Sequence, residues 1–380
     1  MAQVTLGDVA IESRETYKGD KSGMPIVGLE HLIPEDVVLS LWDKDKENTF
    51  TKMFRRGDML FGRRRAYLKK AAQAPFDGIC SGDITVIRAK EDRLIPELLP
   101  FIIQNDVLFD FAVGKSAGSL SPRVKWENLK NYKFELPPLP EQKKLAEALW
   151  AINDTLQAYQ KLLIETDELV KSQFIEMVQP LLDAGNTVPL GELVETDRPI
   201  TYGILKPGTG FPGGVPVVKV KDMKDGLIDQ SDLLLTSPEI DNSYKRSRLQ
   251  AGDLLISIRG SVGRMAEVPE NLENANITQD TARLTIKREY NKVFIRGVLE
   301  SQPLQHDMEK NIRGVAVKGI NIGYLRELGI PVCCRSKQDE LAALYIQSDK
   351  SKFALQNAIS AARETKRSII ADALGIKGKE

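Results

Sequence analysis

Two groups of basic residues carry the clearest chemical signal in this sequence. The first group lies within residues 52–70, where one acid, Asp58, stands among the basic residues Lys52, Arg55, Arg56, Arg63, Arg64, Arg65, Lys69 and Lys70. The second group lies within residues 245–264, where Asp253 stands among Lys245, Arg246, Arg248, Arg259 and Arg264. The planar fork of arginine can bind phosphate or the O6 and N7 atoms of guanine. Either group alone could consist of solvated charges at the edge of a strand. Because the pattern recurs in both parts of the chain, it favours a protein that contacts one polyanion at two places.

Within these groups we single out the residues that we expect to contact nucleic acid. They are Arg63, Arg64, Arg65 and Lys69 in the first part of the chain, and Arg259, Ser261, Arg264 and Gln279 in the second. The arginines and the lysine can bind phosphate or guanine, whereas the glutamine side chain can pair with adenine. Loss of a phosphate contact weakens binding to all sequences alike, whereas loss of a base contact relaxes one position.

No residues with the spacing of a common catalytic or metal site are present in the sequence. The three cysteines, Cys80, Cys333 and Cys334, lack the spacing of a zinc site and are interpreted as reduced, mostly buried thiols. Two histidines leave little for histidine-based catalysis. The glycines lack the strand, loop and helix context of a nucleotide-binding site, and Asp83 and Asp280 have no lysine or histidine at suggestive spacing. We therefore expect no catalytic residue, no metal and no cofactor in this chain.

Length and composition are typical of a globular protein of two or three domains. The chain has 380 residues, 42% hydrophobic and 28% charged, and its 53 basic and 53 acidic residues give zero formal net charge. Disorder and a disulfide scaffold are excluded. No apolar run of about 18 residues occurs, and the start MAQVTLGDVA lacks the layout of a secretory signal, so the sequence predicts a cytoplasmic protein.

The chain contains one unit of about 190 residues twice. The string VTLGDV at residues 4–9 recurs as VPLGEL at 188–193, and GDMLFGRRR from Gly57 recurs as GDLLISIRG from Gly252. The string LKNYKFELPPLPEQKKLAEAL from Leu129 aligns with LRELGIPVCCRSKQDELAAL from Leu325, and KSQFIEM aligns with RSIIADA. Four landmarks in the same order at slowly growing offsets indicate duplication.

Each copy combines a mixed α and β globular part with a long amphipathic helix. Short β-rich runs broken by glycine and proline turns fill residues 1–138 and 185–332. From Leu145 to Met177 apolar residues recur every three or four positions, so we expect a helix from Pro140 to Val178, about 58 Å long at 1.5 Å per residue. A weaker seam, interrupted by Ser348 and Lys352, predicts the second helix from about Ser336 to Leu374. We expect the two helices to pack against each other.

These strings resemble the specificity subunit of type I restriction-modification enzymes. The resemblance rests on residues 57–88, on SPRVKWENLKNYKFELPPLPEQ at 121–142 and on the helix that ends in KSQFIEM. In the second copy it rests on residues 252–269, on NITQDTARLTI at 276–286 and on the pattern from Gly314 to Leu328. One departure is the replacement of PPLPEQ by PVCCRSKQ at 331–338, which bears on whether both helix starts make the same partner contact.

The resemblance implies a DNA-recognition protein without catalytic activity, of the α+β class, with two duplicated target-recognition domains and a pair of long antiparallel coiled-coil helices. The boundaries expected are 1–138 for the first recognition domain, 139–184 for the first helix, 185–334 for the second domain and 335–380 for the second helix. Each domain would read one half of a bipartite double-stranded DNA target. Two methyltransferase subunits would bind around the chain and use S-adenosylmethionine, and restriction subunits could add cleavage with ATP and Mg.

Two other functions stay open from the residues. A self-contained DNA methyltransferase or nuclease would need an Asn-Pro-Pro or Asp-Pro-Pro string, and the double proline at 137–138 follows Leu136. A coiled-coil scaffold could use the arginines for acidic protein partners. Because paired helices hold a fixed span, four residues inserted near Glu165 are expected to lengthen the spacer of the DNA target.

Overall fold

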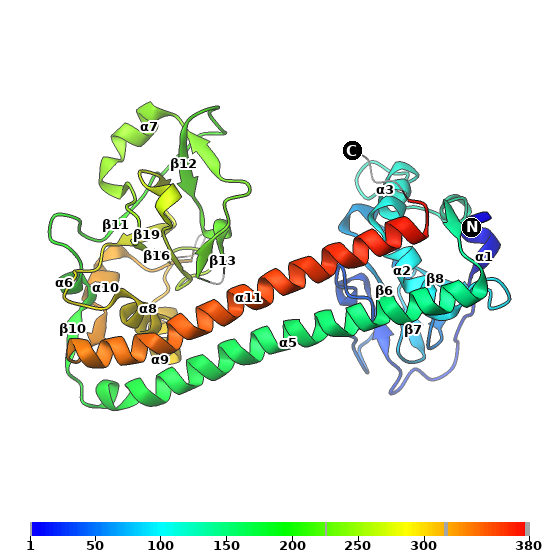
Figure 1. The fold of residues 1–380 in the computed structure, drawn as a ribbon, viewed down its shortest axis with the longest axis horizontal. Coiled ribbons are helices and arrows are strands. Elements are labelled where there is room, and N and C mark those ends of the chain that lie inside the picture. The colour runs from blue at the N-terminus through cyan, green and yellow to red at the C-terminus, as the bar shows by residue number, and fades with distance from the viewer. Residues whose placement is uncertain (1, 225, 315–317, 377–380) are drawn as a thin grey trace. The chain divides into compact units, whose positions relative to one another are not determined.

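The computed structural model describes residues 2–224, 226–314 and 318–376, and it divides into two compact units that are described one at a time (Figure 1). Unit 1 comprises Met1–Lys161 and Leu355–Glu380, and unit 2 comprises Leu162–Ala354. The long helices α5 (Leu139–Asp183) and α11 (Arg335–Ala373) each contribute to both units. Residues 315–317 of the Gly314 to Leu328 pattern and residues 377–380 of the expected second helix segment lie outside the described residues.

Unit 1 contains two small sheets with short helices around them. An antiparallel sheet has the strand order β2 (Ala10–Glu12), β8 (Ile84–Ala89), β5 (Met59–Gly62) and β6 (Ala71–Gln73). A second sheet has the order β3 (Ile26–Val27), β7 (Gly78–Cys80) and β4 (Lys52–Phe54). The remaining elements are β1 (Ala2–Thr5) paired with β9 (Lys133–Leu136), and the helices α1 (Leu6–Val9), α2 (Leu99–Ile103), α3 (Asp106–Gly114) and α4 (Trp126–Leu129).

Unit 2 repeats this plan. Its antiparallel sheet has the order β11 (Thr201–Tyr202), β19 (Thr281–Leu284), β16 (Leu254–Ser257) and β17 (Met265–Glu267). Its three-stranded sheet has the order β15 (Leu234–Thr236), β12 (Val215–Val218) and β18 (Asn276–Ile277). The other elements are β10 (Thr187–Pro189) paired with β20 (Gly329–Pro331), β13 (Met223–Lys224) paired with β14 (Leu227–Ile228), and helices α6 (Leu190–Leu193), α7 (Pro238–Ser243), α8 (Lys292–Glu300), α9 (Gln302–Lys310) and α10 (Ile322–Glu327).

The two units differ in how the three-stranded sheet is completed. Both contain one parallel pair, β3 with β7 in unit 1 and β12 with β18 in unit 2. The third, antiparallel strand is added beside the later member of the pair in unit 1 and beside the earlier member in unit 2. The four-stranded sheet is therefore the shared part, and the three-stranded sheet is where the copies diverge.

The repeated Gly-Asp string has a structural role just before the central strands β5 and β16. Gly57 and Gly252 have φ of 90° and 83°, which a side chain would disfavour. The buried carboxylate of Asp58 accepts from the Arg55 amide at 2.8 Å, as that of Asp253 accepts from the Gln250 amide at 2.8 Å. Guanidinium groups neutralise both carboxylates, from Arg88 in unit 1 and from Arg198 in unit 2, each at 2.7 Å. The sequence repeat therefore encodes a turn and a buried ion pair.

Each long helix is fixed to its unit by one buried glutamine near its start. In unit 1 the Gln142 side chain accepts from the Ile95 amide at 3.0 Å and donates to the carbonyls of Arg93 and Pro137. In unit 2 the Gln338 side chain accepts from the Asn291 amide at 2.8 Å and donates to the Cys333 carbonyl. Loss of the proline-rich string in the second copy thus leaves this attachment to the unit in place.

Replacing Gln142 with leucine is expected to weaken the attachment of α5 to unit 1. The change leaves the Ile95 amide and two carbonyls without their partner, and each unsatisfied group costs roughly 1–3 kcal/mol. Hydrogen exchange of the full chain should therefore show the Ile95 amide at least tenfold less protected. Gln338→Leu should have the corresponding effect on the Asn291 amide and leave Ile95 unchanged. Unchanged protection at Ile95 in Gln142→Leu would contradict this role.

The long helices lie side by side in antiparallel orientation within each unit, as Figure 1 also shows. In unit 1 Leu149 of α5 shares a core with Ile370 of α11 and with Leu374, which follows the end of that helix. In unit 2 the rings of Phe174 and Tyr345 meet edge to face with centroids 4.8 Å apart. The predicted fold class, two mixed α and β globular parts with a pair of long antiparallel helices, is confirmed.

The first helix is longer than the range from Pro140 to Val178 that its apolar spacing predicted. It begins at Leu139 and continues past Val178 to Asp183, because Leu181 and Leu182 pack against the core of unit 2. Pro180 stands inside its last turns, and Gly185, with φ of 67°, follows the end as expected. The interruption at Lys352 is explained by its ion pair with Asp167 on the other helix.

The three cysteines differ in burial. Cys80 is buried in β7, and burial raises the pKa of its thiol to about 12. Cys333 is partly buried, and Cys334 is exposed just before α11. The expectation of mostly buried thiols is therefore wrong for Cys334, because the segment between β20 and α11 runs over the surface.

Candidate nucleic-acid interface

In unit 1 the predicted residue Arg64 belongs to a polar cluster at the end of β5. Its guanidinium donates to the Ser121 hydroxyl at 2.5 Å and lies 3.5 Å from the Asp83 carboxylate. Arg123 donates to the same carboxylate at 2.7 Å, and this hydrogen bond holds the pKa of Asp83 below its usual range. Both arginine side chains remain about two-fifths exposed, at 40% and 42%. The cluster thus presents two oriented guanidinium groups to solvent.

The other predicted residues of unit 1 make contacts that differ from those of Arg64. Arg65 has φ of 54°, is exposed, and donates its amide to the Pro122 carbonyl at 2.8 Å, so the loop after β5 lies against residues 117–123. Arg63 is half-buried, and its Nε has no partner among the described residues. Lys69 points to the Asp106 carboxylate at 2.6 Å, at the start of α3. The structure therefore groups Arg64 and Arg65 with the 117–123 segment and pairs Lys69 with a different element.

In unit 2 the predicted residues Arg259 and Gln279 lie together at the end of β16, the strand that corresponds to β5. Arg259 is exposed after β16 and donates to the Gln279 side-chain oxygen at 2.9 Å. Its backbone pairs with Gly319, as that of Arg64 pairs with Arg123 in unit 1. The paired side chains retain an amide NH₂ on Gln279 and further N–H donors on Arg259, which are the groups that read base edges.

Ser261 and Arg264 are exposed, but each also makes hydrogen bonds within unit 2. The Ser261 carbonyl accepts from the Ser257 hydroxyl. The Arg264 guanidinium donates to the carbonyls of Val220 and Met223 at 3.3 and 3.2 Å. This contact directs Arg264 toward the turn before β13.

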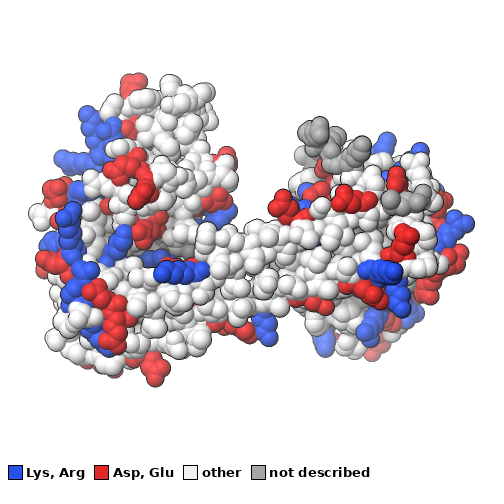
Figure 2. Space-filling view, viewed as in Figure 1, with Lys and Arg blue, Asp and Glu red and all other residues white. Residues whose placement is uncertain are grey.

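Several basic residues of the two sequence groups form internal ion pairs. Arg55 pairs with Glu15 and Asp77, Lys52 with Glu12, and Arg248 with Asp241. Figure 2 accordingly shows basic and acidic side chains interspersed over the globular part of each unit on the face in view. The sequence windows therefore overstate the local positive charge.

Sequence reasoning did not select four residues that accompany the predicted ones. In unit 1 Ser121 and Arg123 contact Arg64 and Asp83. In unit 2 exposed Lys318 precedes Gly319, whose backbone pairs with Arg259 and with exposed Arg313. The available signal was position, because residues 121–123 and 318–319 lie about 195 residues apart in the two copies. Comparing the copies beyond the basic windows would have found them.

One group of possible metal ligands occurs among the described residues, outside this cluster. Ligand atoms of Glu30, His31 and Asp43 lie within 4.8 Å of one another. Lys46 already pairs with Asp43 at 2.7 Å, and His31 Nδ1 accepts from the Gly28 amide at 2.9 Å. We assign these residues to the hydrogen bonding of the loop.

Comparison with known proteins finds similarity to one family. Residues 1–166 match the type I restriction modification DNA specificity domain. The chain is 28% identical over 271 residues to the type I restriction enzyme EcoBI specificity subunit of Escherichia coli, which covers 63% of the chain. Over these residues the chain is similar to the specificity subunits of type I restriction-modification enzymes. The chain is also 31% identical over 107 residues, 27% of its length, to the EcoDI specificity subunit of Escherichia coli. It spans little more than half, 56%, of the EcoBI subunit and 23% of the EcoDI subunit.

Solved structures show the same fold. One, a chain from a study of complex assembly in the type I restriction-modification system, superposes with a TM-score of 0.53 at 21% identity, covering 98% of this chain and 97% of that one. The S subunit of the type I system from M. genitalium gives a TM-score of 0.55 at 13% identity, covering 100% and 96%. Among the described residues, no helix of this chain is long and apolar enough to cross a membrane.

Proposed function

We propose that this chain is a specificity subunit and supplies the DNA-sequence recognition of a type I restriction-modification complex. The observation that carries the proposal is the equivalent polar cluster at the end of the central strand in each unit. Arg64 with Arg123 occupies it in unit 1, and Arg259 with Gln279 occupies it in unit 2. Two such clusters fit a bipartite target in which each unit reads one half.

The residues proposed to bind DNA are those singled out from the sequence. They are Arg63, Arg64, Arg65, Lys69, Arg259, Ser261, Arg264 and Gln279. Geometry supports base reading most directly for Arg259 and Gln279, whose hydrogen bond orients both side chains while leaving donors free. Lys69, held by Asp106, is better suited to a phosphate. Sequence boundaries at 138, 184 and 334 are proposed to separate the recognition domains from the helices.

The long helices are proposed to fix the spacer of the target and to receive the partner subunits. Within unit 2 they expose large apolar side chains, which supports a protein partner there: Leu162, Ile164, Leu169, Ile346 and Phe353. Two methyltransferase subunits and, where present, restriction subunits are the proposed partners. S-adenosylmethionine, ATP and Mg are proposed to act in those partners, with no catalytic residue in this chain.

DNA binding by the assembled complex tests the proposal. Affinity for one bipartite sequence should exceed affinity for scrambled DNA by at least about 10³-fold and should fall steeply as salt is raised. Binding that ignores sequence and salt would favour a protein-binding scaffold instead. Methyl transfer by this chain alone would favour a self-contained enzyme.

A further inference from the structure

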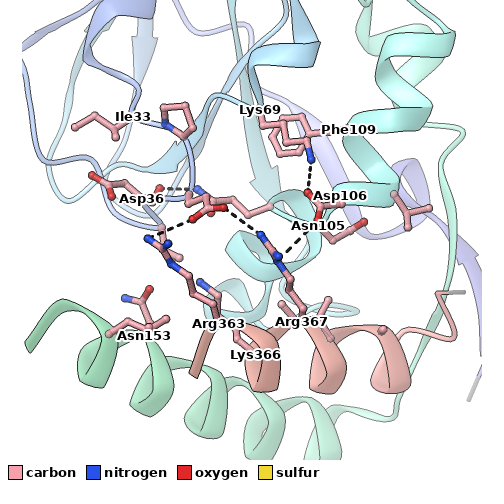
Figure 3. Close-up of a pocket in the computed structure, with 18 of the residues that line it drawn as sticks. Ile33, Asp36, Lys69, Asn105, Asp106, Phe109, Asn153, Arg363, Lys366 and Arg367 are labelled. Carbon is pink, nitrogen blue, oxygen red and sulfur yellow. Dashed lines mark hydrogen bonds and ion pairs between the residues drawn. The ribbon is translucent and has the colours of Figure 1, made fainter. Parts of the chain in front are cut away.

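Unit 1 contains a cavity of about 420 Å³ between its globular part and the two long helices (Figure 3). Its walls come from the loop around Asp36, the start of α3, the middle of α5 and the last turns of α11. Apolar side chains on these walls include Ile33, Phe109, Leu156 and Ile370. The volume lies in the range of small-molecule sites.

The cationic side chains at this cavity differ in whether they have a carboxylate partner. Three cationic side chains, Arg363, Lys366 and Arg367, extend from α11 toward the globular part, as Figure 3 shows. Glu35 pairs with Arg363 at 3.4 Å and with Arg367 at 3.1 Å. Asp106 pairs with Lys69 at 2.6 Å and lies 3.8 Å from Arg367. Each of these arginines thus has a carboxylate partner.

Lys366 is the exception among them. Its ammonium makes no hydrogen bond and no ion pair with the described residues of either unit, and burial lowers its pKa. The side chain of Asn153, only 4% exposed, lines the same cavity with an Nδ2 that has no hydrogen-bond partner among the described residues. An unpaired buried donor such as the Asn153 Nδ2 is costly, which is why most are satisfied by a partner, and Lys366 beside it is half-buried.

Unit 2 provides a comparison on the same helix. There Lys352 of α11 pairs with Asp167, and the buried Arg296 pairs with Glu300 and with Asp349 of α11. Buried cations beside the helices in unit 2 therefore have carboxylate partners within the chain. Lys366 in the unit 1 cavity has no such carboxylate partner among the described residues.

We propose that this cavity binds a small organic anion, whose phosphate or carboxylate group contacts Lys366 beside Asn153 and whose apolar body packs against Phe109, Leu156 and Ile370. An anionic group would supply the acceptors that Lys366 and Asn153 lack. The apolar walls favour a compact hydrocarbon or aromatic body over a bare ion. This site lies outside the polar cluster of Arg64 and does not depend on the DNA-recognition role.

Titration calorimetry of the full chain with three probes tests the proposal. Phenyl phosphate and benzoate carry the two candidate anionic groups, and benzyl alcohol is an uncharged control. At least one anion should bind at a single site, and its affinity should exceed that of benzyl alcohol by at least about tenfold, the worth of one charge-assisted hydrogen bond. The stronger anion identifies the preferred group.

Substitutions place the bound anion in the cavity. Lys366→Met should weaken binding by about tenfold or more, and Lys366→Gln, which keeps a polar end, serves if the methionine variant fails to fold. Lys144→Met changes an exposed lysine of α5 in the same unit and should leave binding unchanged. The proposal is overturned if neither anion binds, if benzyl alcohol binds as tightly, or if the folded Lys366 variant binds the anion as the unaltered chain does.

Discussion

Four residues inserted into each long helix are expected to lengthen the DNA spacer by about two base pairs and to leave both half-sites unchanged. Four helical residues add about 6 Å, which is close to two steps of about 3.4 Å along the duplex. The structure shows that both helices must be changed together, because Asp167 of α5 pairs with Lys352 of α11. The matched insertion points are after Glu165 and after Ala354. Methylation mapping of the complex would report the spacer.

A loop insertion is the control for this experiment. Four residues added at Gly23, in an exposed turn of unit 1 where φ is 74°, lengthen the chain without lengthening a helix. That variant should retain the original spacer. An unchanged spacer in a folded, active double-helix insertion would contradict the proposal that the helices set the spacing.

Arg259→Ala is expected to weaken binding to the full target by about fivefold to 150-fold and to relax one base position in the second half-site. A good bidentate contact to a base is worth roughly 1–3 kcal/mol of discrimination. Arg259 is the exposed arginine whose orientation is fixed by Gln279 at 2.9 Å, so losing it also releases the glutamine. Affinity measured against a library of single-base changes in the target would reveal the relaxed position.

The hydrogen bond between these residues predicts coupling. Gln279→Ala should relax the same or the adjacent position, and the double variant should lose less than the sum of the single losses. Arg246→Ala removes an exposed arginine of the same sequence group and should affect all sequences alike or none. Uniform weakening in Arg259→Ala would assign Arg259 to a phosphate and contradict base reading.

Duplication and the long helices could be predicted from the sequence because both leave periodic signals. Apolar residues at spacings of three and four define the helix seam over many turns, whereas the end of α5 depends on how Leu181 and Leu182 pack against the core of unit 2. The Gly-Asp repeat was visible, but its role required the partners Arg88 and Arg198, which lie 30 and 55 residues away from the aspartates. Long-range ion pairs leave no local pattern.

The sequence predicted the kind of candidate site, a basic cluster in each copy, but only some of the residues that form it. Basic windows identified Arg64 and Arg259, because arginine after a central strand is a local feature. They did not show that Lys69, with φ of 51°, is directed to Asp106, or that Arg123 shares Asp83 with Arg64. The cavity at Lys366 had no sequence signal, because its walls come from five separate segments.

Mapping of methylated adenines tests the central claim most directly. The chain would be co-expressed with a methyltransferase subunit of the same system in a host that lacks this modification, and each subunit would also be expressed alone. The account predicts one bipartite motif with a fixed spacer, modified only when both subunits are present. A complex that forms and binds S-adenosylmethionine yet methylates no bipartite motif would contradict DNA recognition by this chain.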